Sequence, residues 1–154
     1  MLIDSMRPGR NQIVLGAFAA ILAAGWMIYI ARASCVPVTG TGAVTVSVAN
    51  LRSGSAQDYC YTDSAGRKLR FILARGSDGR VRSVFDACRQ CFTYHRGFKV
   101  SDGELICRVC GNHYPMNHMT EGKASCVPAS LPHQDAGAAV TIKTSDLESG
   151  RYLF

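Results

Sequence analysis

Two pairs of cysteines constrain this chain more than any other feature of its sequence. Cys88 and Cys91 form one pair, and Cys107 and Cys110 form the second, in the pattern C-x2-C-x15-C-x2-C. Each pair places two thiols on one tight turn, and two such turns that face each other form a tetrahedral cage of four sulfurs. A cage of this kind suits Zn²⁺, a single iron or an iron–sulfur cluster. We therefore predict that these four cysteines bind a metal. The alternative is a pair of disulfides or of redox-active dithiols.

The chain contains seven cysteines, so at least one thiol is free or bound to a metal. Cys126 lies downstream of both pairs and is an additional candidate ligand. Cys35 and Cys60 belong to no motif. We expect them to be buried or unpaired thiols. A disulfide between them is the alternative if the domain lies outside the cytoplasm.

Three histidines lie near the cysteine pairs. His113 follows Cys110 by three residues and is a further candidate ligand, or a hydrogen-bond partner of one. His95 and His118 flank the same region, and His133 stands in no recognisable pattern. We expect the last three to be surface or packing residues.

The N-terminal segment is strongly apolar. No charged residue occurs from Asn11 to Ala31, and residues 12–31 are long enough to cross a bilayer as one helix. Arg7 and Arg10 precede this segment and favour a cytoplasmic N-terminus. We predict an uncleaved membrane anchor. The competing interpretation is a signal peptide cleaved after Ala31-Arg32-Ala33.

The rest of the chain is typical of a small β domain. Alternating or β-rich stretches separated by Gly-containing turns predict four strands, namely Ala43–Ala49, Asp58–Thr62, Lys68–Arg75 and Arg80–Phe85. We expect an antiparallel meander with one apolar face, which leads directly to the first cysteine pair. No long amphipathic helix is predicted after residue 35. The fold class is therefore mainly β (α+β): a transmembrane helix, then a small antiparallel domain with two metal-binding turns. The expected divisions are 1–33 for the cytoplasmic tip and anchor, 34–42 for a linker and 43–154 for the extracytoplasmic domain.

Two segments of the chain resemble each other. Residues 44–54 and 140–150 are identical at five of eleven positions, and both read as a strand followed by a turn. Two copies are too few for a repeat architecture. We expect them to form two similar strands of one sheet.

Composition excludes several classes of function. The chain has 17 basic and 11 acidic residues, for a formal net charge of +6, but the basic residues are scattered. We expect no nucleic-acid binding, because no basic cluster is present. No nucleophile elbow, phosphate-binding loop or paired acidic motif is present either. An electron carrier or an accessory subunit is therefore favoured over an enzyme.

Several of these motifs together resemble the FtrD-like family of membrane-anchored iron–sulfur proteins. The resemblance runs from about Asn50 to Pro132 and rests on Leu51-Arg52-Ser53-Gly54, Asp78-Gly79-Arg80, Phe85-Asp86-Ala87-Cys88-Arg89-Gln90-Cys91, Leu105-Ile106-Cys107-Arg108-Val109-Cys110-Gly111 and Cys126-Val127-Pro128. It implies a role in bacterial iron uptake beside a permease and periplasmic copper proteins, with electron transfer as the proposed activity. This chain departs from the family at Cys126, where Ala124-Ser125 replaces the usual two glycines.

Two functions follow for the domain. The first is electron transfer by an iron–sulfur or iron centre, as a component of a membrane system for iron transport. The alternative is a non-catalytic accessory subunit stabilised by a structural zinc ribbon. No twin-arginine pair precedes the apolar segment, which favours zinc or a single metal ion over a cluster inserted before export. A thiol–disulfide oxidoreductase is the weakest hypothesis, because no βαβ pattern surrounds either pair.

The expected location is a bacterial inner membrane crossed once, with the C-terminal domain in the periplasm. The expected partners are the lipid bilayer, through residues 12–31, and a membrane protein such as a permease or a larger complex.

Overall fold

The described part of the chain is mainly β, as expected, and its strands form three sheets. The computed structural model describes residues 35–121 and 126–154. The central sheet has the strand order β1-β3-β4-β5-β9, with β1 at Val36–Val38, β3 at Ser55–Thr62, β4 at Lys68–Arg75, β5 at Val81–Cys88 and β9 at Pro128–Ser130. The β11 sheet has the order β10-β11-β2, with β10 at Gln134–Asp135, β11 at Ala139–Lys143 and β2 at Ala43–Ser47. The β7 sheet has the order β6-β7-β8, with β6 at Phe98–Ser101, β7 at Glu104–Cys107 and β8 at His113–Pro115.

Short helices complete the described domain. The 3-10 helix η1 at Phe92–Tyr94 follows the first cysteine pair. Helix α2 at Thr144–Ser149 and the 3-10 helix η2 at Arg151–Leu153 follow β11. Their shortness agrees with the expectation of no long helix in this domain.

Strands β3, β4 and β5 are three strands of the predicted antiparallel meander. The expected first strand, β2, instead pairs with β11 in a separate sheet, because the residues that match it lie at Ala139–Lys143. The register pairs Tyr59 with Phe71, and Phe71 with Phe85. Strand β4 has the predicted bounds, whereas β5 continues to Cys88 and therefore itself carries the first cysteine of the first pair. Gly66 and Gly79 occupy the two turns with φ of 79° and 78°, a conformation that glycine adopts without steric cost.

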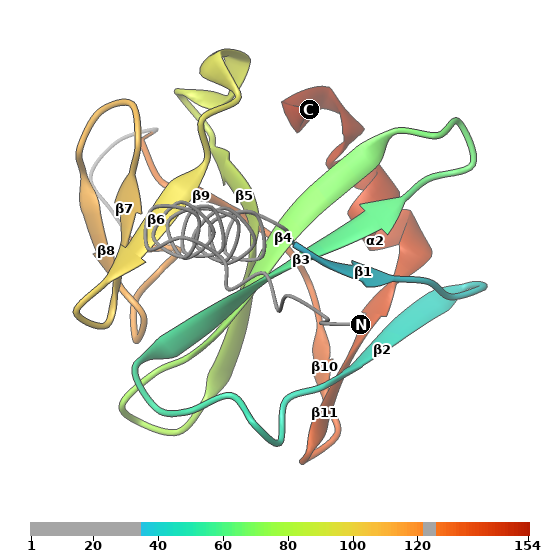
Figure 1. The fold of residues 1–154 in the computed structure, drawn as a ribbon, viewed down its shortest axis with the longest axis horizontal. Coiled ribbons are helices and arrows are strands. Elements are labelled where there is room, and N and C mark those ends of the chain that lie inside the picture. Colours follow the sequence, from blue (N-terminus) through green and yellow to red (C-terminus); the bar gives the residue numbers. More distant parts are fainter. Residues whose placement is uncertain (1–34, 122–125) are drawn as a thin grey trace, which may run out of the picture. The chain divides into compact units, whose positions relative to one another are not determined.

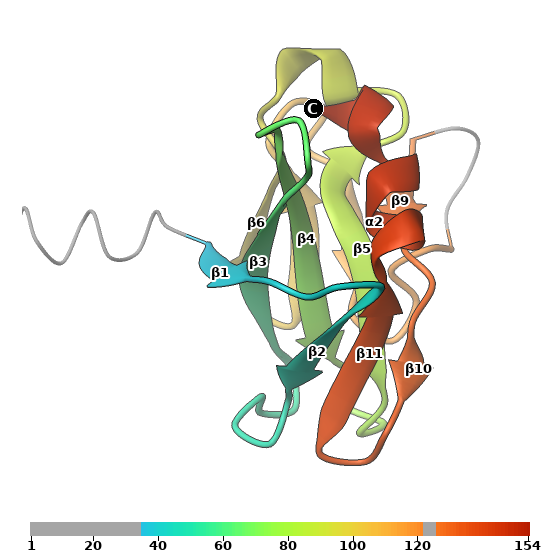
Figure 2. The same cartoon turned by 90° about the vertical axis from the view of Figure 1, so that its right-hand side faces the viewer.

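The central sheet is buried on both faces, so the expectation of one apolar face is wrong. Alternate residues of β4 point to opposite sides: Leu69, Phe71 and Leu73 join one hydrophobic cluster, and Ile72 and Ala74 join a second. The β11 sheet and α2 cover the first side, and the β7 sheet covers the other (Figures 1 and 2). A strand covered on both faces is nearly continuous in apolar residues, which explains why β4 shows little alternation.

The two similar segments lie side by side in the β11 sheet, as predicted. Strands β2 and β11 pair antiparallel, with Val44 opposite Ile142 and Val46 opposite Val140. The segments diverge after their strands: residues 50–54 form a turn, whereas residues 144–149 form α2. Their shared strand pattern therefore serves one common apolar face.

Cys35 and Cys60 form a disulfide, so the favoured interpretation as free thiols is wrong. Strand β1 lies within the segment expected as a linker and pairs parallel to β3, with Val36 opposite Tyr59. This pairing sets the two cysteines side by side at the edge of the central sheet. The predicted anchor, residues 12–31, lies outside the described residues. Within the described ranges, no helix is long and apolar enough to cross a membrane.

Polar contacts also connect the C-terminal end of the domain to the meander. Asp63, in the turn between β3 and β4, accepts hydrogen bonds from the backbone N–H groups of Ala65 and Arg67 and pairs with Arg151 at 2.7 Å. The contact between Asp63 and Arg151 therefore fixes η2 against the sheet.

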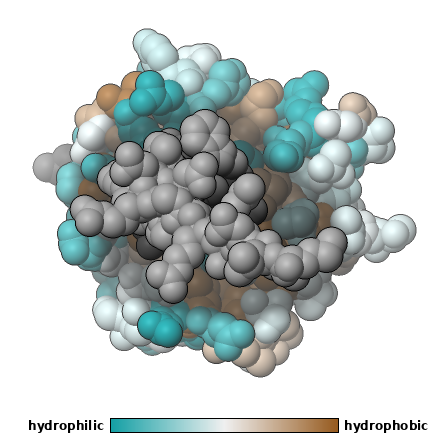
Figure 3. Space-filling view, in the orientation of Figure 1, coloured by the Kyte–Doolittle hydropathy of each residue, from teal (hydrophilic) through white to brown (hydrophobic). Residues whose placement is uncertain are grey.

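On the face of the molecule shown in Figure 3, hydrophilic residues lie in separate groups around the margin.

Candidate metal centre

Four cysteine sulfurs converge at one end of the central sheet. The thiol sulfurs of Cys88, Cys91, Cys110 and Cys126 all lie within 4.8 Å of one another. Cys126 Sγ is 3.5 Å from Cys88 Sγ and 3.2 Å from Cys110 Sγ. Four thiolates around one tetrahedral ion at ~2.3 Å lie about 3.8 Å apart. The donor type and spacing therefore fit a thiolate-bound metal centre.

The first cysteine turn is built at the end of β5. The backbone N–H of Cys91 donates to the carbonyl of Cys88 at 3.1 Å, which closes a tight turn and brings both thiols to one side. The backbone N–H of Arg89 donates to the carbonyl of Val127 at 2.9 Å. This bond ties the turn to the segment that carries Cys126.

The second cysteine turn is built at the end of β7. The backbone N–H of Gly111 donates to the carbonyl of Cys107 at 3.0 Å, and Gly111 has φ of 73°. Glycine adopts this positive φ without steric cost. The backbone N–H of Arg108 donates to the carbonyl of Gly97 at 3.1 Å and fixes the turn against β6.

Cys126 enters the group through long-range pairing. Strand β9 pairs with β5, with Pro128 opposite Cys88, so the residues just before β9 lie beside the first cysteine turn. The hydroxyl of Tyr114, on β8, donates to the carbonyl of Cys126 and lies 3.7 Å from its sulfur. Tyr114 was not among the residues predicted to serve the site, and no motif marks it in the sequence.

Cys107 lies beside the group of four rather than within it. Its thiol contacts that of Cys110 and is close enough to Cys91 to influence that group's ionisation. The structure thus assembles five thiols: the four predicted from the two pairs, and the additional candidate Cys126. The tightest group contains Cys126 in place of Cys107.

The thiols strongly influence one another's ionisation. Burial, followed by the negative charge of Cys88 and contacts with other thiols, raises the pKa of Cys91. Burial is also the largest effect at Cys126, and contacts with neighbouring thiols help raise its pKa to about 11. Burial acts in the same direction at Cys110, but hydrogen bonds from the Asn112 backbone and neighbouring thiols outweigh it and lower the pKa to about 7. Neighbouring thiolates repel one another, and a bound cation would offset their negative charge. Metal binding is therefore expected to release protons from the thiols.

The family comparison agrees with this centre. The model of the family described as "Membrane iron-sulfur containing protein FtrD-like" matches residues 51–154. The chain belongs to the FtrD-like family. The match covers most of the domain, including all five thiols of the centre. No curated protein matches the chain.

The histidines of this FtrD-like chain lie outside the group of four sulfurs. His113 Nδ1 is 2.7 Å from Glu104 Oε2, so this candidate ligand is engaged by a carboxylate on the surface. His118 Nδ1 is 3.0 Å from Glu121 Oε2, in agreement with the expected surface role. His133 Nδ1 lies 2.7 Å from the hydroxyl of Ser83, in agreement with a packing role.

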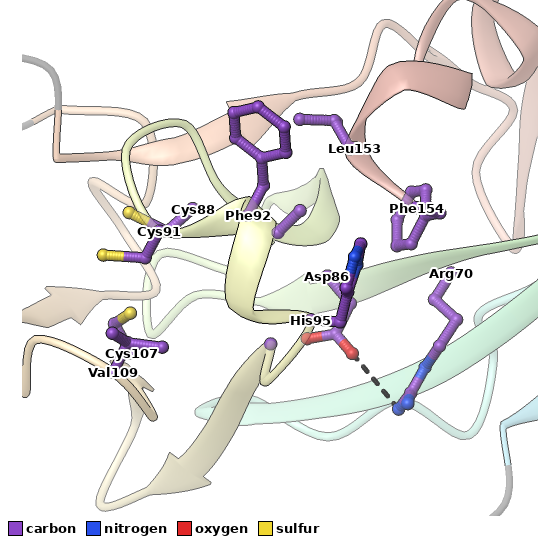
Figure 4. Close-up of a pocket in the computed structure, with 12 residues that line it drawn as sticks. Arg70, Asp86, Cys88, Cys91, Phe92, His95, Cys107, Val109, Leu153 and Phe154 are labelled. Carbon is purple, nitrogen blue, oxygen red and sulfur yellow. Dashed lines mark ion pairs between the residues drawn. The ribbon is translucent and has the colours of Figure 1, made fainter.

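A small cavity of about 150 Å³ adjoins the centre of the FtrD-like domain. Figure 4 shows Cys88 and Cys91 opposite Cys107 on one side, with Asp86, His95 and Arg70 on the other.

The buried carboxylate of Asp86 holds this side of the cavity together. It accepts a hydrogen bond from the Phe98 backbone N–H at 2.7 Å and pairs with Arg70 at 3.1 Å. Burial outweighs these partners and raises the pKa of Asp86 to about 6. A Cβ atom at Gly97 would lie 2.3 Å from Asp86 Oδ1, so only glycine fits there. Asp86 thus connects β5 to β6 and sets the β7 sheet against the first cysteine turn.

Proposed function

We propose that this FtrD-like chain is an electron-transfer protein with an iron–sulfur or iron centre, as part of a membrane system for iron transport. The convergence of four thiols in a domain of this family carries the proposal. Cys88, Cys91, Cys110 and Cys126 would hold the centre, and Cys107 would lie beside it. A bound centre of this kind supplies one-electron transfer.

The protein environment favours this use. Cys88 and Cys91 are 3% and 9% exposed, so the protein excludes water from one side of the centre. Backbone N–H groups of the second cysteine turn donate to Cys107 and Cys110, and such hydrogen bonds help to set the reduction potential of thiolate-bound iron. Cys110 is exposed, which gives the centre an edge that a partner can approach.

The proposed location is the outer side of a bacterial inner membrane. Residues 12–31 would anchor the chain in the bilayer, with a cytoplasmic N-terminus and residues 43–154 in the periplasm. The Cys35–Cys60 disulfide supports an oxidising compartment, because disulfides persist there and are rare in the cytosol. A permease or a larger membrane complex is the proposed partner.

Metal analysis of the full chain tests the redox proposal. The chain would be purified without oxygen in detergent, and its iron, sulfide and zinc contents measured beside its visible absorption and electron paramagnetic resonance spectra. We expect a coloured protein with a signal that changes on reduction. A colourless protein with one zinc per chain would reject the redox function.

The alternative of a structural zinc ribbon is supported by the sulfur spacing. All four sulfurs lie within 4.8 Å of one another, which suits a single tetrahedral ion. The same measurement of metal content separates this alternative from the proposal.

Two matched variants test which thiols bind the metal. Cys126→Ser is expected to lose most of the bound metal, whereas Cys107→Ser should retain it with a shifted spectrum. The opposite ranking would assign the fourth ligand to Cys107. A Cys35→Ser/Cys60→Ser double variant serves as a control and should bind metal like the wild type.

A further inference from the structure

A basic groove lies beside the second cysteine turn. It is shallow and open, with a volume of about 360 Å³, and is lined by Arg96, Lys99, Ile106, Cys107, Arg108, Val109 and Gly111. Three of these residues are positively charged and none is acidic. The groove therefore presents positive potential next to the thiol centre.

None of the three cations forms an ion pair with a described residue. Arg96 and Lys99 are exposed, and neither forms an ion pair with any residue of ranges 35–121 and 126–154. Arg108 has a structural role as well, because its Nε donates to the carbonyl of Phe98 at 2.8 Å. Of the acidic residues in the β6–β7 hairpin, Glu104 pairs with His113, and Asp102 lies in the turn at the far end from the cysteines. The charge on Arg96 and Lys99 is therefore available to a partner.

An apolar residue and an exposed thiol adjoin these cations. Val109 lines the groove and is 38% exposed, although it is a large aliphatic residue. Cys110, the next residue, is the exposed member of the group of four thiols. An apolar centre with a charged rim is the usual composition of a protein–protein interface.

We propose that this basic groove, formed by Arg96, Lys99, Arg108 and Val109, docks an acidic redox protein beside Cys110. The proposal rests on the electron-transfer function proposed above. Complementary charge would speed the encounter and orient the partner, and its effect would fall as salt increases. A bound iron–sulfur or iron centre in its reduced state would give one electron to a partner such as a ferric haem protein, whose iron would become ferrous. No bond forms or breaks in that step, and no proton is transferred.

A protein partner fits the groove better than an anionic bilayer does. The groove is lined by the aliphatic side chains of Ile106 and Val109 as well as by its basic residues, and an apolar contact of this kind suits a protein surface better than lipid head groups do. A lipid surface would be held through Arg96 and Lys99 alone. It would also cover the thiol edge at Cys110, through which a partner would exchange electrons.

The test compares two c-type cytochromes of similar size, one acidic and one basic. Each would be titrated into the full chain in detergent micelles at low ionic strength, and the dissociation constant obtained from backbone amide shifts in NMR spectra. We expect the acidic cytochrome to bind at least about tenfold more tightly than the basic one. Its largest shifts should fall at residues 96–99 and 106–111. The preference should disappear at about 0.5 M salt.

A charge-matched pair of variants locates the effect. Arg96→Glu/Lys99→Glu should weaken binding of the acidic cytochrome by about tenfold and strengthen that of the basic one. The control, Arg52→Glu/Lys143→Glu, changes net charge equally but alters exposed residues outside the β7 sheet. It should leave the preference intact. Arg108 is not altered, because its contact with Phe98 supports the turn.

Three outcomes would overturn the proposed groove. The two cytochromes could bind equally, or the control pair could reduce binding as much as the groove pair. The groove pair could also lose binding to phosphatidylglycerol vesicles while its affinity for the acidic cytochrome is unchanged, which would assign the groove to lipid. A zinc-containing wild type that shows the expected charge preference would reject electron transfer but keep the docking surface.

Discussion

The two faces of the central sheet are covered by different kinds of side chain. On the β11 side, the cluster consists of aliphatic and aromatic side chains, including Leu69, Phe71, Leu73, Val140, Ile142 and Leu147. On the β7 side, the cluster includes Cys88, Cys91, Cys107, Tyr114, Met116 and Met119. The core of the β11 side is therefore formed by apolar burial, with polar contacts such as Asp63–Arg151 at its edge. The other face places polarisable sulfur and ionisable thiols where a second hydrocarbon layer would otherwise lie.

The difference indicates that metal binding contributes most to the β7 side. The β7 sheet has strands of only three or four residues, and small sheets of this size depend on what they pack against. Two of its connections, the second cysteine turn and the segment before β9, supply thiols to the centre. A metal bound there would fasten the β7 sheet to β5.

Metal removal should have the largest effect on stability, and it should destabilise the β7 sheet while the central sheet and the β11 sheet stay folded. Structural metal sites of this type contribute on the order of 10 kcal/mol to folding. With a chelator, we expect amide hydrogen exchange at residues 98–115 to accelerate by at least about a hundredfold, while β3, β4 and β11 stay protected. Cys91→Ser should resemble the chelated wild type and show no further change with chelator. Equal loss of protection in all three sheets would contradict the division.

A leucine-to-alanine change on each face of the central sheet should distinguish loss of packing from loss of metal binding. Leu73 and Leu105 are both fully buried, the first against the β11 side and the second in β7. Each change to alanine should cost about 2–5 kcal/mol in the free energy of unfolding. Only Leu105→Ala should also weaken metal binding, because β7 carries Cys107 and leads into the second cysteine turn. Competition with a chelator of known affinity would measure that difference, and equal metal affinities in both variants would argue against the coupling.

Strands β2 to β5 were predictable because their signals are local, although the sheet to which β2 belongs was not. The alternation at Val44, Val46 and Val48 predicted β2, and the apolar run of β4 predicted its bounds. The expectation of one apolar face failed at β4 because burial on the second face depends on the β7 sheet. None of the strands of that sheet was predicted, since they are too short for a clear periodicity.

The site was predictable only as far as spacing within the chain allowed. Three of the four thiols that converge belong to the two predicted pairs. Cys126 joins them through the pairing of β9 with β5, a contact between segments about 40 residues apart that no local motif encodes. The Cys35–Cys60 disulfide likewise follows from the parallel pairing of β1 with β3, which local sequence signals did not reveal.

Removal of the disulfide should weaken the central sheet and spare the centre. The Cys35–Cys60 bond closes a loop with a sequence separation of 25. Loss of a bond over a loop of this length costs about 3 kcal/mol. We expect Cys35→Ser/Cys60→Ser to lower the urea midpoint by a corresponding amount and to release β1, with unchanged metal content. Loss of metal in this variant would show that the two sides are coupled through β3.

The two buried carboxylates of Asp63 and Asp86 should have the smallest effects on the free energy of unfolding, and their contributions should depend on pH in opposite directions. The backbone N–H of Arg67, the side chain of Arg151 and the backbone N–H of Ala65 donate hydrogen bonds that lower the pKa of Asp63 below 3.8 despite the effect of burial. Its stabilisation is thus present above pH 3.8 and is lost as the pH falls through the lower folded pKa. Burial raises the pKa of Asp86 to about 6. Its contribution is present below pH 3.8 and is lost as the pH rises through about 6.

Asparagine variants of the two residues would show directly that their contributions to the free energy of unfolding change with pH in opposite directions. Relative to the wild type, Asp86→Asn should gain on the order of 2 kcal/mol between pH 4 and pH 7, because the wild type must ionise a buried carboxyl there. Asp63→Asn should instead be less stable than the wild type at pH 7 and approach it below pH 3. Urea unfolding at each pH would measure both differences, and NMR titration of the two carboxyl carbons would give the pKa values. A change of the same sign in both variants would show that the two faces do not differ in how they hold a buried charge.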